Sequence, residues 1–191
     1  MKIFLSLFFS FLLTYWSIYY SIPFFKKFFL DVPNTRSSHM ISKPRGYGII
    51  FVLVGIFFSL IYEEYSLLLL VPLTFIGFLD DKYNIPSKIR YLVQFFSSLS
   101  FIALTDFGRN FYTLISTEFF ILNLIFLLLF VIFSTAIINF TNFMDGIDGL
   151  VSGCMLVLIT LSVFLNFNFL VGFIGSLLAF FIWNWSPSKI F

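Results

Sequence analysis

Long apolar stretches alternate with short polar segments along the whole chain, and each stretch approaches the length of a bilayer crossing. Seven such stretches can be drawn, at residues 3–22, 47–62, 65–79, 90–105, 119–140, 150–165 and 169–185. Because an upright transmembrane helix needs about 20 mostly apolar residues, flanking residues must complete the shorter crossings. The pattern predicts an all-α fold, a polytopic membrane helix bundle with about seven transmembrane helices in this chain.

Composition supports the same class of protein. The 191 residues are 60% hydrophobic and only 10% charged, whereas soluble globular domains carry about 25% charged residues. The first apolar stretch exceeds the roughly 7–15 residues of a signal-peptide core, so we expect a retained first helix. The single cysteine, Cys154, excludes an intrachain disulfide and a cysteine-rich metal site. We predict one integral membrane domain over residues 1–191, without internal repeats.

The positive charges predict how the chain is oriented in the membrane. Nine of the eleven Lys and Arg residues fall in connections that a seven-helix arrangement puts on one side: Lys26, Lys27, Arg36, Lys43, Arg45, Lys82, Lys88, Arg90 and Lys189. Because Lys and Arg collect in cytoplasmic loops, this side is predicted to be cytoplasmic and the N-terminus to lie outside. Four polar segments with candidate chemistry lie on that side.

The first segment is residues 31–48, DVPNTRSSHMISKPRGYG. Its prolines discourage a helix, and Gly46 and Gly48 permit close approach of the backbone to a ligand. Arg36, Lys43 and Arg45 are suited to charge-assisted hydrogen bonds with phosphate oxygens. The same cations would also suit a basic loop that rests on anionic lipid head groups, and the segment alone does not decide between the two.

The second segment contains the adjacent acids Asp80 and Asp81, just after a predicted helix that begins near Tyr65 and contains Pro72. Neighbouring carboxylates repel each other unless a cation lies nearby. A hard divalent ion such as Mg²⁺ can be held by one or two carboxylates together with a substrate phosphate. The alternative is structural, because either aspartate could simply end a helical turn.

The third segment spaces Asn139, Asn142, Asp145 and Asp148 three residues apart. In a helical or near-helical turn, these side chains would point roughly the same way. Acids at membrane depth are costly, by about 2.5–3.5 kcal/mol even on insertion scales, so a polar cluster beside apolar flanks favours a binding function. The other interpretation is a solvated loop.

The fourth segment, WNWSPSKIF over residues 183–191, carries Asn184 at the end of the last apolar stretch and Lys189 beyond it. Tryptophan and lysine are typical of the membrane–water interface. Taken alone, this segment therefore indicates an interfacial belt and nothing more.

Taken together and in this order, the four segments resemble the polyprenyl-phosphate N-acetylhexosamine-1-phosphate transferases, a family of glycosyltransferase family 4 type. The peptidoglycan phospho-MurNAc-pentapeptide transferase is a more distant member, and the RSSH and PRG stretches are most similar to the subgroup that initiates O-antigen. The matching stretches are D-x-P-N-x-R-S-S-H with PRG (31–46), G-x-x-D-D (77–81) followed by Arg90 and Gln94, N-x-x-N-x-x-D-G-I-D-G-L (139–150) and W-N-x-x-P (183–187).

The resemblance implies a reaction and its participants. A sugar 1-phosphate would pass from a UDP-linked N-acetylated sugar to undecaprenyl phosphate with release of UMP, which would initiate a lipid-linked cell-envelope glycan. The cofactor implied is Mg²⁺, or Mn²⁺ in its place. The implied location is the bacterial inner membrane, with the motif loops cytoplasmic. We expect no nucleic-acid partner, and the oligomeric state stays open, with a homodimer as one option.

The resemblance also suggests a role for each site residue. Asp80 or Asp81 would be catalytic, and would orient or deprotonate the lipid phosphate; a phospho-aspartyl step is the rival scheme. Asp80, Asp81, Asp145 and Asp148 are the expected metal ligands. The residues expected to bind substrate or nucleotide are Arg36, His39, Lys43, Arg45, Asn139, Asn142, Asp145, Asp148 and Asn184.

The chain departs from the family pattern at two places. Tyr47 stands where the family has glycine, which leaves the geometry of its loop open. Phe191 ends the chain just before the Gly-Asp of the family, whose aspartate is its main magnesium ligand, so we expect a C-terminally truncated, N-terminal part of a fold with roughly ten helices. The alternatives are a truncated, inactive pseudoenzyme that binds lipid phosphate or nucleotide, and a segment of a membrane transporter, which would place polar residues along a path at mid-bilayer.

Overall fold

The computed structural model describes residues 1–31, 42–105, 120–144 and 146–190. This part of the chain is almost entirely helical and confirms the predicted all-α class. Its α-helices are α1 (Lys2–Phe28), α2 (Gly48–Leu60), α3 (Val71–Tyr83), α4 (Ser87–Leu104), α6 (Phe120–Met144), α7 (Leu150–Phe164) and α8 (Val171–Asn184). Two short 3₁₀ turns, Ser66–Leu70 and Asn168–Leu170, precede α3 and α8. The strands β1 (Leu30–Asp31) and β2 (Lys43–Pro44) form one short antiparallel pair beside α1.

The third predicted stretch differs from expectation at both ends. It begins with a 3₁₀ turn, and Pro72 lies in the first turn of α3 rather than inside a helix. That position suits proline, since its missing N–H has no helical partner there. The helix continues to Tyr83 and ends at Asn84, which has a left-handed φ of 48°. The two adjacent aspartates are therefore part of the last turns of α3 and do not follow it.

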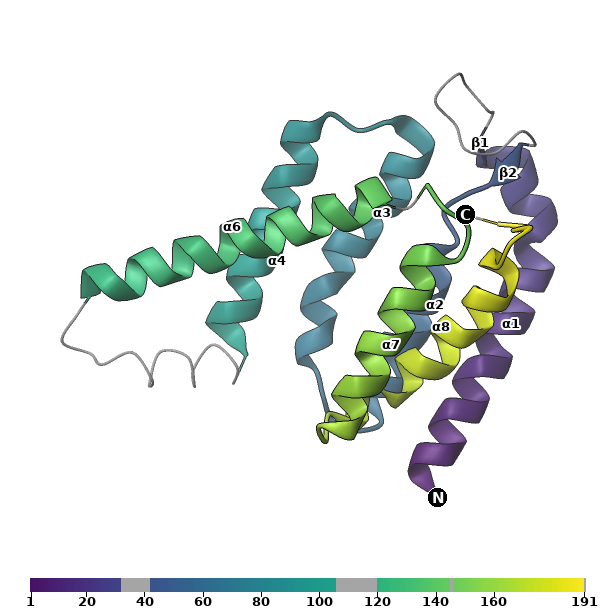
Figure 1. Cartoon of the computed structure of the whole chain (residues 1–191), viewed down its shortest axis with the longest axis horizontal. Coiled ribbons are helices and arrows are strands. Elements are labelled where there is room, and N and C mark those ends of the chain that lie inside the picture. Colours follow the sequence, from purple (N-terminus) through teal and green to yellow (C-terminus); the bar gives the residue numbers. More distant parts are fainter. Residues whose placement is uncertain (32–41, 106–119, 145, 191) are drawn as a thin grey trace.

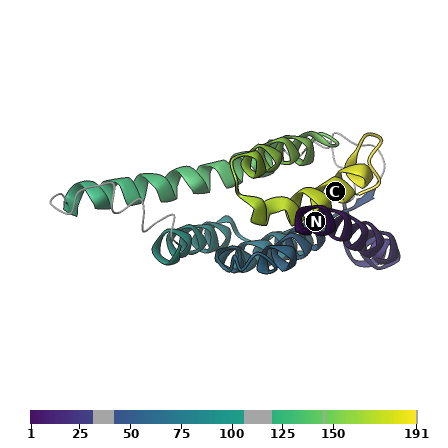
Figure 2. The same cartoon turned by 90° about the horizontal axis from the view of Figure 1, so that it is seen from below.

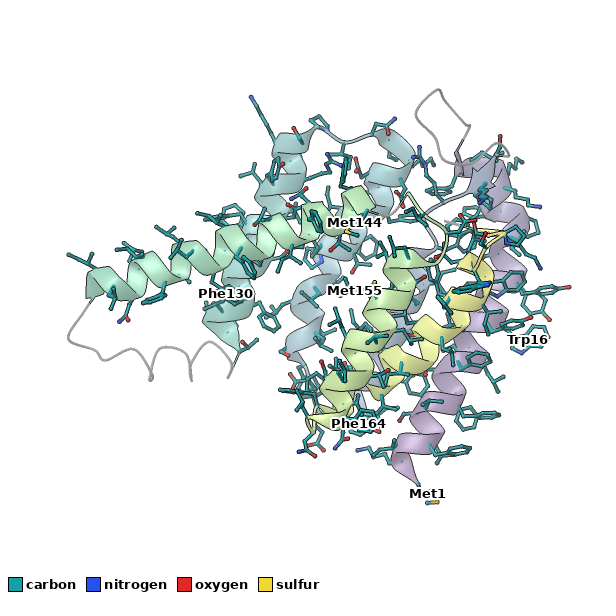
Figure 3. The ribbon with its side chains drawn as sticks, viewed as in Figure 1. Met1, Trp16, Phe130, Met144, Met155 and Phe164 are labelled. Carbon is teal, nitrogen blue, oxygen red and sulfur yellow. The ribbon has the colours of Figure 1, made fainter. Side chains whose placement is uncertain are left out.

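Two helices, α1 and residues Ile121–Met144 of α6, are long and apolar enough to cross a membrane, and α2, α7 and α8 are shorter apolar helices. Their outer faces carry large apolar side chains. Figure 3 shows Trp16 of α1 pointing away from the bundle, and 48% of its surface is exposed. Phe133 and Phe164 are exposed by 66% and 79%. Apolar surface on this scale is costly in water and suits lipid, as the predicted membrane bundle requires.

Helix α8 is the centre of the bundle, because ten of its fourteen residues are buried. It lies between α1 and α2, with α7 on a further side (Figure 1). Small residues allow α1 and α8 to approach closely: Ser6, Ser10 and Thr14 are buried along one face of α1. A Cβ atom at Gly175 would lie 2.2 Å from the carbonyl oxygen of Leu7. Close approach of small residues is a common source of helix association in membranes, where apolar burial gives little advantage.

Tyr47 contributes to the same core. Its side chain is fully buried and stacks on Phe25, with the ring centroids 4.3 Å apart. It belongs to a cluster with Ile18, Leu177 and other residues of α1 and α8. Tyr47, which stands where the family has glycine, thus fills the core between the helices.

Helix α6 lies apart from this core. Figure 1 shows it running away from the bundle at a steep angle to α7, and Figure 2 shows α6 and α7 above the row of α2, α3 and α4. Its closest neighbour is α4, and it touches α7 only near the joining turn. The α3–α4 turn, the end of α6, the start of α7 and the end of α8 all lie at the β1–β2 end of the molecule (Figure 1).

The contact between α1 and α8 leads to a first prediction. Gly175→Ala should destabilise the fold by about 1–3 kcal/mol, because the new methyl group overlaps the backbone of Leu7 and must push the helices apart. Thermal unfolding of the detergent-purified protein would measure the change. Gly77→Ala in α3 is the matched control, since no atom lies within 4 Å of its Cβ position. An unchanged unfolding temperature for Gly175→Ala would contradict the proposed role of this contact.

Candidate active site

A cavity of about 410 Å³ lies at the end of the bundle where the polar motif segments meet. Its polar lining comes from four regions: the loop before α2 with the start of that helix, α3 with the start of α4, the end of α6, and α7. These residues are Gly46, Gly48, Thr74, Asp80, Asp81, Arg90, Gln94, Asn139, Asn142 and Ser152. The remaining lining is mostly apolar and includes Phe51, Val52, Leu73, Met155, Leu177 and Phe180. Three of the four segments predicted from the sequence therefore share one amphipathic cavity.

Asp80 closes the turn between α3 and α4. One carboxylate oxygen accepts a hydrogen bond of 2.7 Å from the backbone N–H of Ile85, and the other accepts one of 2.6 Å from Nη1 of Arg90. Its backbone carbonyl accepts from the N–H of Asn84. The alternative in which one aspartate ends a helical turn is thus confirmed for Asp80, and its catalytic role stays a prediction.

Asp81 also lines the cavity and is half-buried. Arg90 lies 2.6 Å from the carboxylate of Asp80 and supplies the cation that two adjacent acids require. Both acids line the cavity, and both oxygens of Asp80 are engaged by the turn. The catalytic role of Asp81 stays a prediction.

Polar contacts join α4 to α6 beside the cavity. Nδ2 of Asn139 donates to Oε1 of Gln94 at 2.7 Å, and Oγ of Ser134 donates to Oγ of Ser98 at 3.0 Å. Gln94 and Ser98 are both at least nine-tenths buried. These contacts hold α6 at the cavity wall, where Asn142 is exposed. Glutamine, asparagine and serine side chains thus join the two helices at this interface.

The third segment only partly shares one face. Asn139 and Asn142 line the cavity, whereas Asp148 does not, and Asp145 lies outside the described residues. The reason is that α6 ends at Met144 and the chain turns before α7 begins. Gly149 has a φ of 75°, which glycine adopts without strain, and it redirects the chain.

Asp148 forms an internal network with Lys43 and Ser188. Nζ of Lys43 donates to its two carboxylate oxygens at 3.0 and 3.1 Å, and to Oγ of Ser188 at 2.6 Å. The hydroxyl and the backbone N–H of Ser188 donate to Asp148 at 2.7 and 3.0 Å. The network joins strand β2, the turn before α7 and the segment after α8. We call these three residues the loop latch.

The loop latch changes the titration of Asp148. Burial tends to raise the pKa of the carboxyl, but the hydrogen bonds from Ser188 and Lys43 and the charge of Lys43 outweigh it, so the pKa is lowered. Lys43 and Asp148 were expected to contact phosphate or metal, and in this structure they pair with each other. The described residues contain no group of three or more His, Cys, Asp or Glu placed to hold a metal ion. Asp145 lies outside them, so the four-aspartate metal site stays a prediction.

Asn184 is a second internal tether. Its side-chain oxygen accepts hydrogen bonds from the N–H of Gly149 at 3.1 Å and from Oγ of Ser152 at 2.8 Å. Its Nδ2 donates to the carbonyl of Ile190 at 3.1 Å, and only 4% of the residue is exposed. These contacts give Asn184 a positioning role, and its expected contact with a nucleoside stays a prediction.

Arg36, His39 and Arg45 are the other residues predicted to bind substrate. Arg36 and His39 lie outside the described residues. Arg45 is half-buried and its backbone N–H donates to the carbonyl of Phe29 at 2.9 Å, but it does not line the cavity. Sequence reasoning missed Ser152 and Ser188. Ser152 lies four residues after Asp148 in the same segment, which was the only signal available for it.

A magnesium ion would find a limited donor set in the described part of the cavity. Asp81 offers a carboxylate, and Asn142 offers an amide oxygen. Hard cations of this kind keep several waters and are often held by one or two carboxylates plus substrate phosphate. These residues fit magnesium provided that the phosphate of a substrate completes the ligand set.

The loop latch gives a second prediction. Because the pKa of Asp148 is lower in the folded state, the latch stabilises the fold above the unfolded pKa of about 3.9, and this stabilisation is lost as the pH falls through the folded pKa. Lys43→Met should reduce stability at pH 7 by about 1–3 kcal/mol and flatten its dependence on pH. Thermal unfolding between pH 7 and pH 3 would measure both effects. The control is Lys88→Met, which changes an exposed lysine on α4. Equal pH profiles for wild type and Lys43→Met would contradict the prediction.

Comparison with known proteins identifies the family to which these sequence segments belong. The profile of glycosyl transferase family 4 matches residues 65–191. The chain is 31% identical over 180 residues to a Bacillus subtilis protein named "Probable undecaprenyl-phosphate N-acetylglucosaminyl 1-phosphate transferase", a match that covers 85% of this chain and 49% of the relative. It is also 31% identical over 166 residues to the phospho-N-acetylmuramoyl-pentapeptide-transferase of Petrotoga mobilis, covering 75% of this chain and 53% of the relative.

A third relative is the undecaprenyl-phosphate alpha-N-acetylglucosaminyl 1-phosphate transferase of Thermotoga maritima, 28% identical over 174 residues, with 85% of this chain and 50% of the relative covered. The chain spans about half the length of these curated relatives. The matched region contains Asp80, Asp81, the Asn139–Gly149 segment and Asn184. On this basis, the chain belongs to glycosyl transferase family 4.

Proposed function

We propose that this protein transfers a sugar 1-phosphate from a nucleotide-activated sugar to a polyprenyl phosphate in the membrane. The observation that carries the proposal is that polar residues from three motif segments line one cavity, whose other lining side chains are mostly apolar. A lipid phosphate needs both kinds of surface, since its chain is apolar and its head group is charged. The names of the relatives support the same reaction class.

The apolar lining suits the isoprenoid chain of the acceptor. Phe51, Leu73 and Leu177 come from α2, α3 and α8 and lie on the bundle side of the cavity. Aliphatic and aromatic side chains bind such a chain by burying its surface, at roughly 25 cal/mol for each Å² removed from water. The phosphate would then lie near the polar residues of α3 and α4.

The reaction needs positioning and charge neutralisation more than covalent chemistry. An oxygen of the lipid phosphate attacks the sugar-linked phosphorus, one P–O bond forms, and the bond to the nucleoside monophosphate breaks. Asp81 orients the attacking phosphate or accepts its proton. Arg90 stays paired with Asp80 and keeps the α3–α4 turn in place. A magnesium ion held by Asp81 and Asn142 would supply positive charge to the diphosphate.

The finer assignment follows the sequence motifs. The RSSH and PRG stretches favour a UDP-linked N-acetylated hexosamine and the release of UMP, as in O-antigen initiation, over a MurNAc-pentapeptide donor. Two of the three relatives described above are named as N-acetylglucosaminyl 1-phosphate transferases, which supports this choice. The distribution of Lys and Arg favours a cytoplasmic cavity mouth in the bacterial plasma membrane.

Binding without turnover is the second candidate function. It is favoured by one observation: among the described residues, the cavity offers two aspartates, and one of them is held by the α3–α4 turn. A protein of this kind would bind the lipid phosphate or the nucleotide at the same cavity. The distinction rests on whether UMP is released.

The third prediction concerns the two adjacent aspartates. Asp81→Asn should lower the rate of UMP release about 100-fold or more, a loss typical of removing one group that stabilises a transition state. Its expression in membranes should stay intact. Asp80→Asn should lower the unfolding temperature instead, because Arg90 then loses its ionised partner.

Membranes that contain the full chain would be supplied with UDP-N-acetylglucosamine, undecaprenyl phosphate and Mg²⁺, and UMP would be quantified. Near-normal release by Asp81→Asn would contradict the role of this residue. Ligand binding by the wild type without any release of UMP would favour the second candidate function.

A further inference from the structure

Gln94 occupies a distinctive place in the cavity wall. It follows Arg90 by one helical turn on α4 and lines the same cavity. Only 6% of the residue is exposed. It therefore lies deeper in the protein than the ion pair of Asp80 and Arg90, in which both side chains are 20–31% exposed.

The orientation of the Gln94 amide is fixed by a chain of hydrogen bonds. The backbone carbonyl of Thr135 can only accept, and Nδ2 of Asn139 donates to it at 2.8 Å. The same nitrogen donates to Oε1 of Gln94 at 2.7 Å. Either amide could in principle be turned over, but a carbonyl of α6 cannot become a donor. Thr135 thus determines that the oxygen of Gln94 faces α6.

The nitrogen of Gln94 is then the group left for the cavity. Within the described residues, Nε2 has no hydrogen-bond partner, and the residue itself is more than nine-tenths buried. The nitrogen is not one of the fully enclosed polar atoms that lack a partner, so it is open to the cavity that Gln94 lines. There it can donate a hydrogen bond to an acceptor that enters the cavity.

We propose that Gln94 is a ligand-binding residue whose Nε2 donates a hydrogen bond to an oxygen of the ligand head group. The inference rests on the proposed function for the identity of the ligand. Two sources supply an uncharged or anionic acceptor there: a phosphate oxygen of the polyprenyl phosphate and the N-acetyl carbonyl of the sugar. Gln94 lies between the charged residues of the α3–α4 turn and the apolar lining, and Nε2 could donate to either oxygen from there.

Equilibrium binding to the purified full chain in nanodiscs tests the proposal. Undecaprenyl phosphate and undecaprenol differ only in the phosphate, and UDP-N-acetylglucosamine and UDP-glucose differ at the N-acetyl group. Gln94→Met removes the donor, and Gln94→Glu keeps an oxygen that can accept from Asn139. Each variant should weaken binding of the relevant ligand about tenfold, the usual effect of one lost hydrogen bond to a buried group.

Ser98→Ala is the matched control. Ser98 lies one turn further along α4, is similarly buried and contacts Ser134 of α6, but does not line the cavity. This variant loses a contact between α4 and α6 without losing a donor to the ligand. Its affinities should match the wild type, and Gln94→Glu should remain folded because its contact with Asn139 is preserved.

The outcomes separate the two ligand sources and the two proposals. Weaker binding of undecaprenyl phosphate with unchanged undecaprenol would assign the donor to the phosphate, and weaker binding of UDP-N-acetylglucosamine with unchanged UDP-glucose would assign it to the N-acetyl group. Unchanged affinities of both Gln94 variants, or an equal loss in Ser98→Ala, would overturn the inference. Failure of the wild type to bind any of the four compounds would overturn the proposed function itself.

Discussion

The close approach of α1 and α8 is the contact on which the rest of the molecule depends. Gly175 admits the backbone of α1, and this places α8 against α2 and α7 as well. In a bilayer, apolar surface alone does not decide which helices associate, so such steric fits and polar contacts between helices determine the arrangement. Through its last residue, Asn184, α8 then extends this order into the turn before α7.

Polar groups in and beside the cavity divide into two kinds. One kind satisfies other parts of the protein: Asp80 closes the α3–α4 turn, Ser152 donates to Asn184, and Asp148 and Lys43 join loops that are far apart in the sequence. The other kind, which includes Asn142, lines the space that a ligand would occupy. Because an unpaired buried charge is expensive, the first kind must be complete before the second can be held in place.

Much of the fold could be predicted from the sequence, because apolar stretches of bilayer length are a direct physical signal. The end of α3 was misplaced because Asn84 and the position of Pro72, which determine its limits, are local features that hydropathy does not register. The four motif segments were predicted to lie on one side of the membrane, and three of them line the cavity. The pairing of Lys43 with Asp148 was not, since 105 residues separate them and a sequence shows charges but not their partners.

The hydrogen bond from Asn139 to the carbonyl of Thr135 makes an asparagine at this position chemically different from an aspartate of the same shape. A carboxylate there would face two acceptors, the carbonyl of Thr135 and the oxygen of Gln94, and could donate to neither when ionised. Relief would require Gln94 to turn over, which would present its oxygen to the cavity. The backbone of α6 thereby determines which end of the Gln94 amide faces the cavity. Exchange of Asn139 for aspartate would make α4 present a hydrogen-bond acceptor to the ligand in place of a donor.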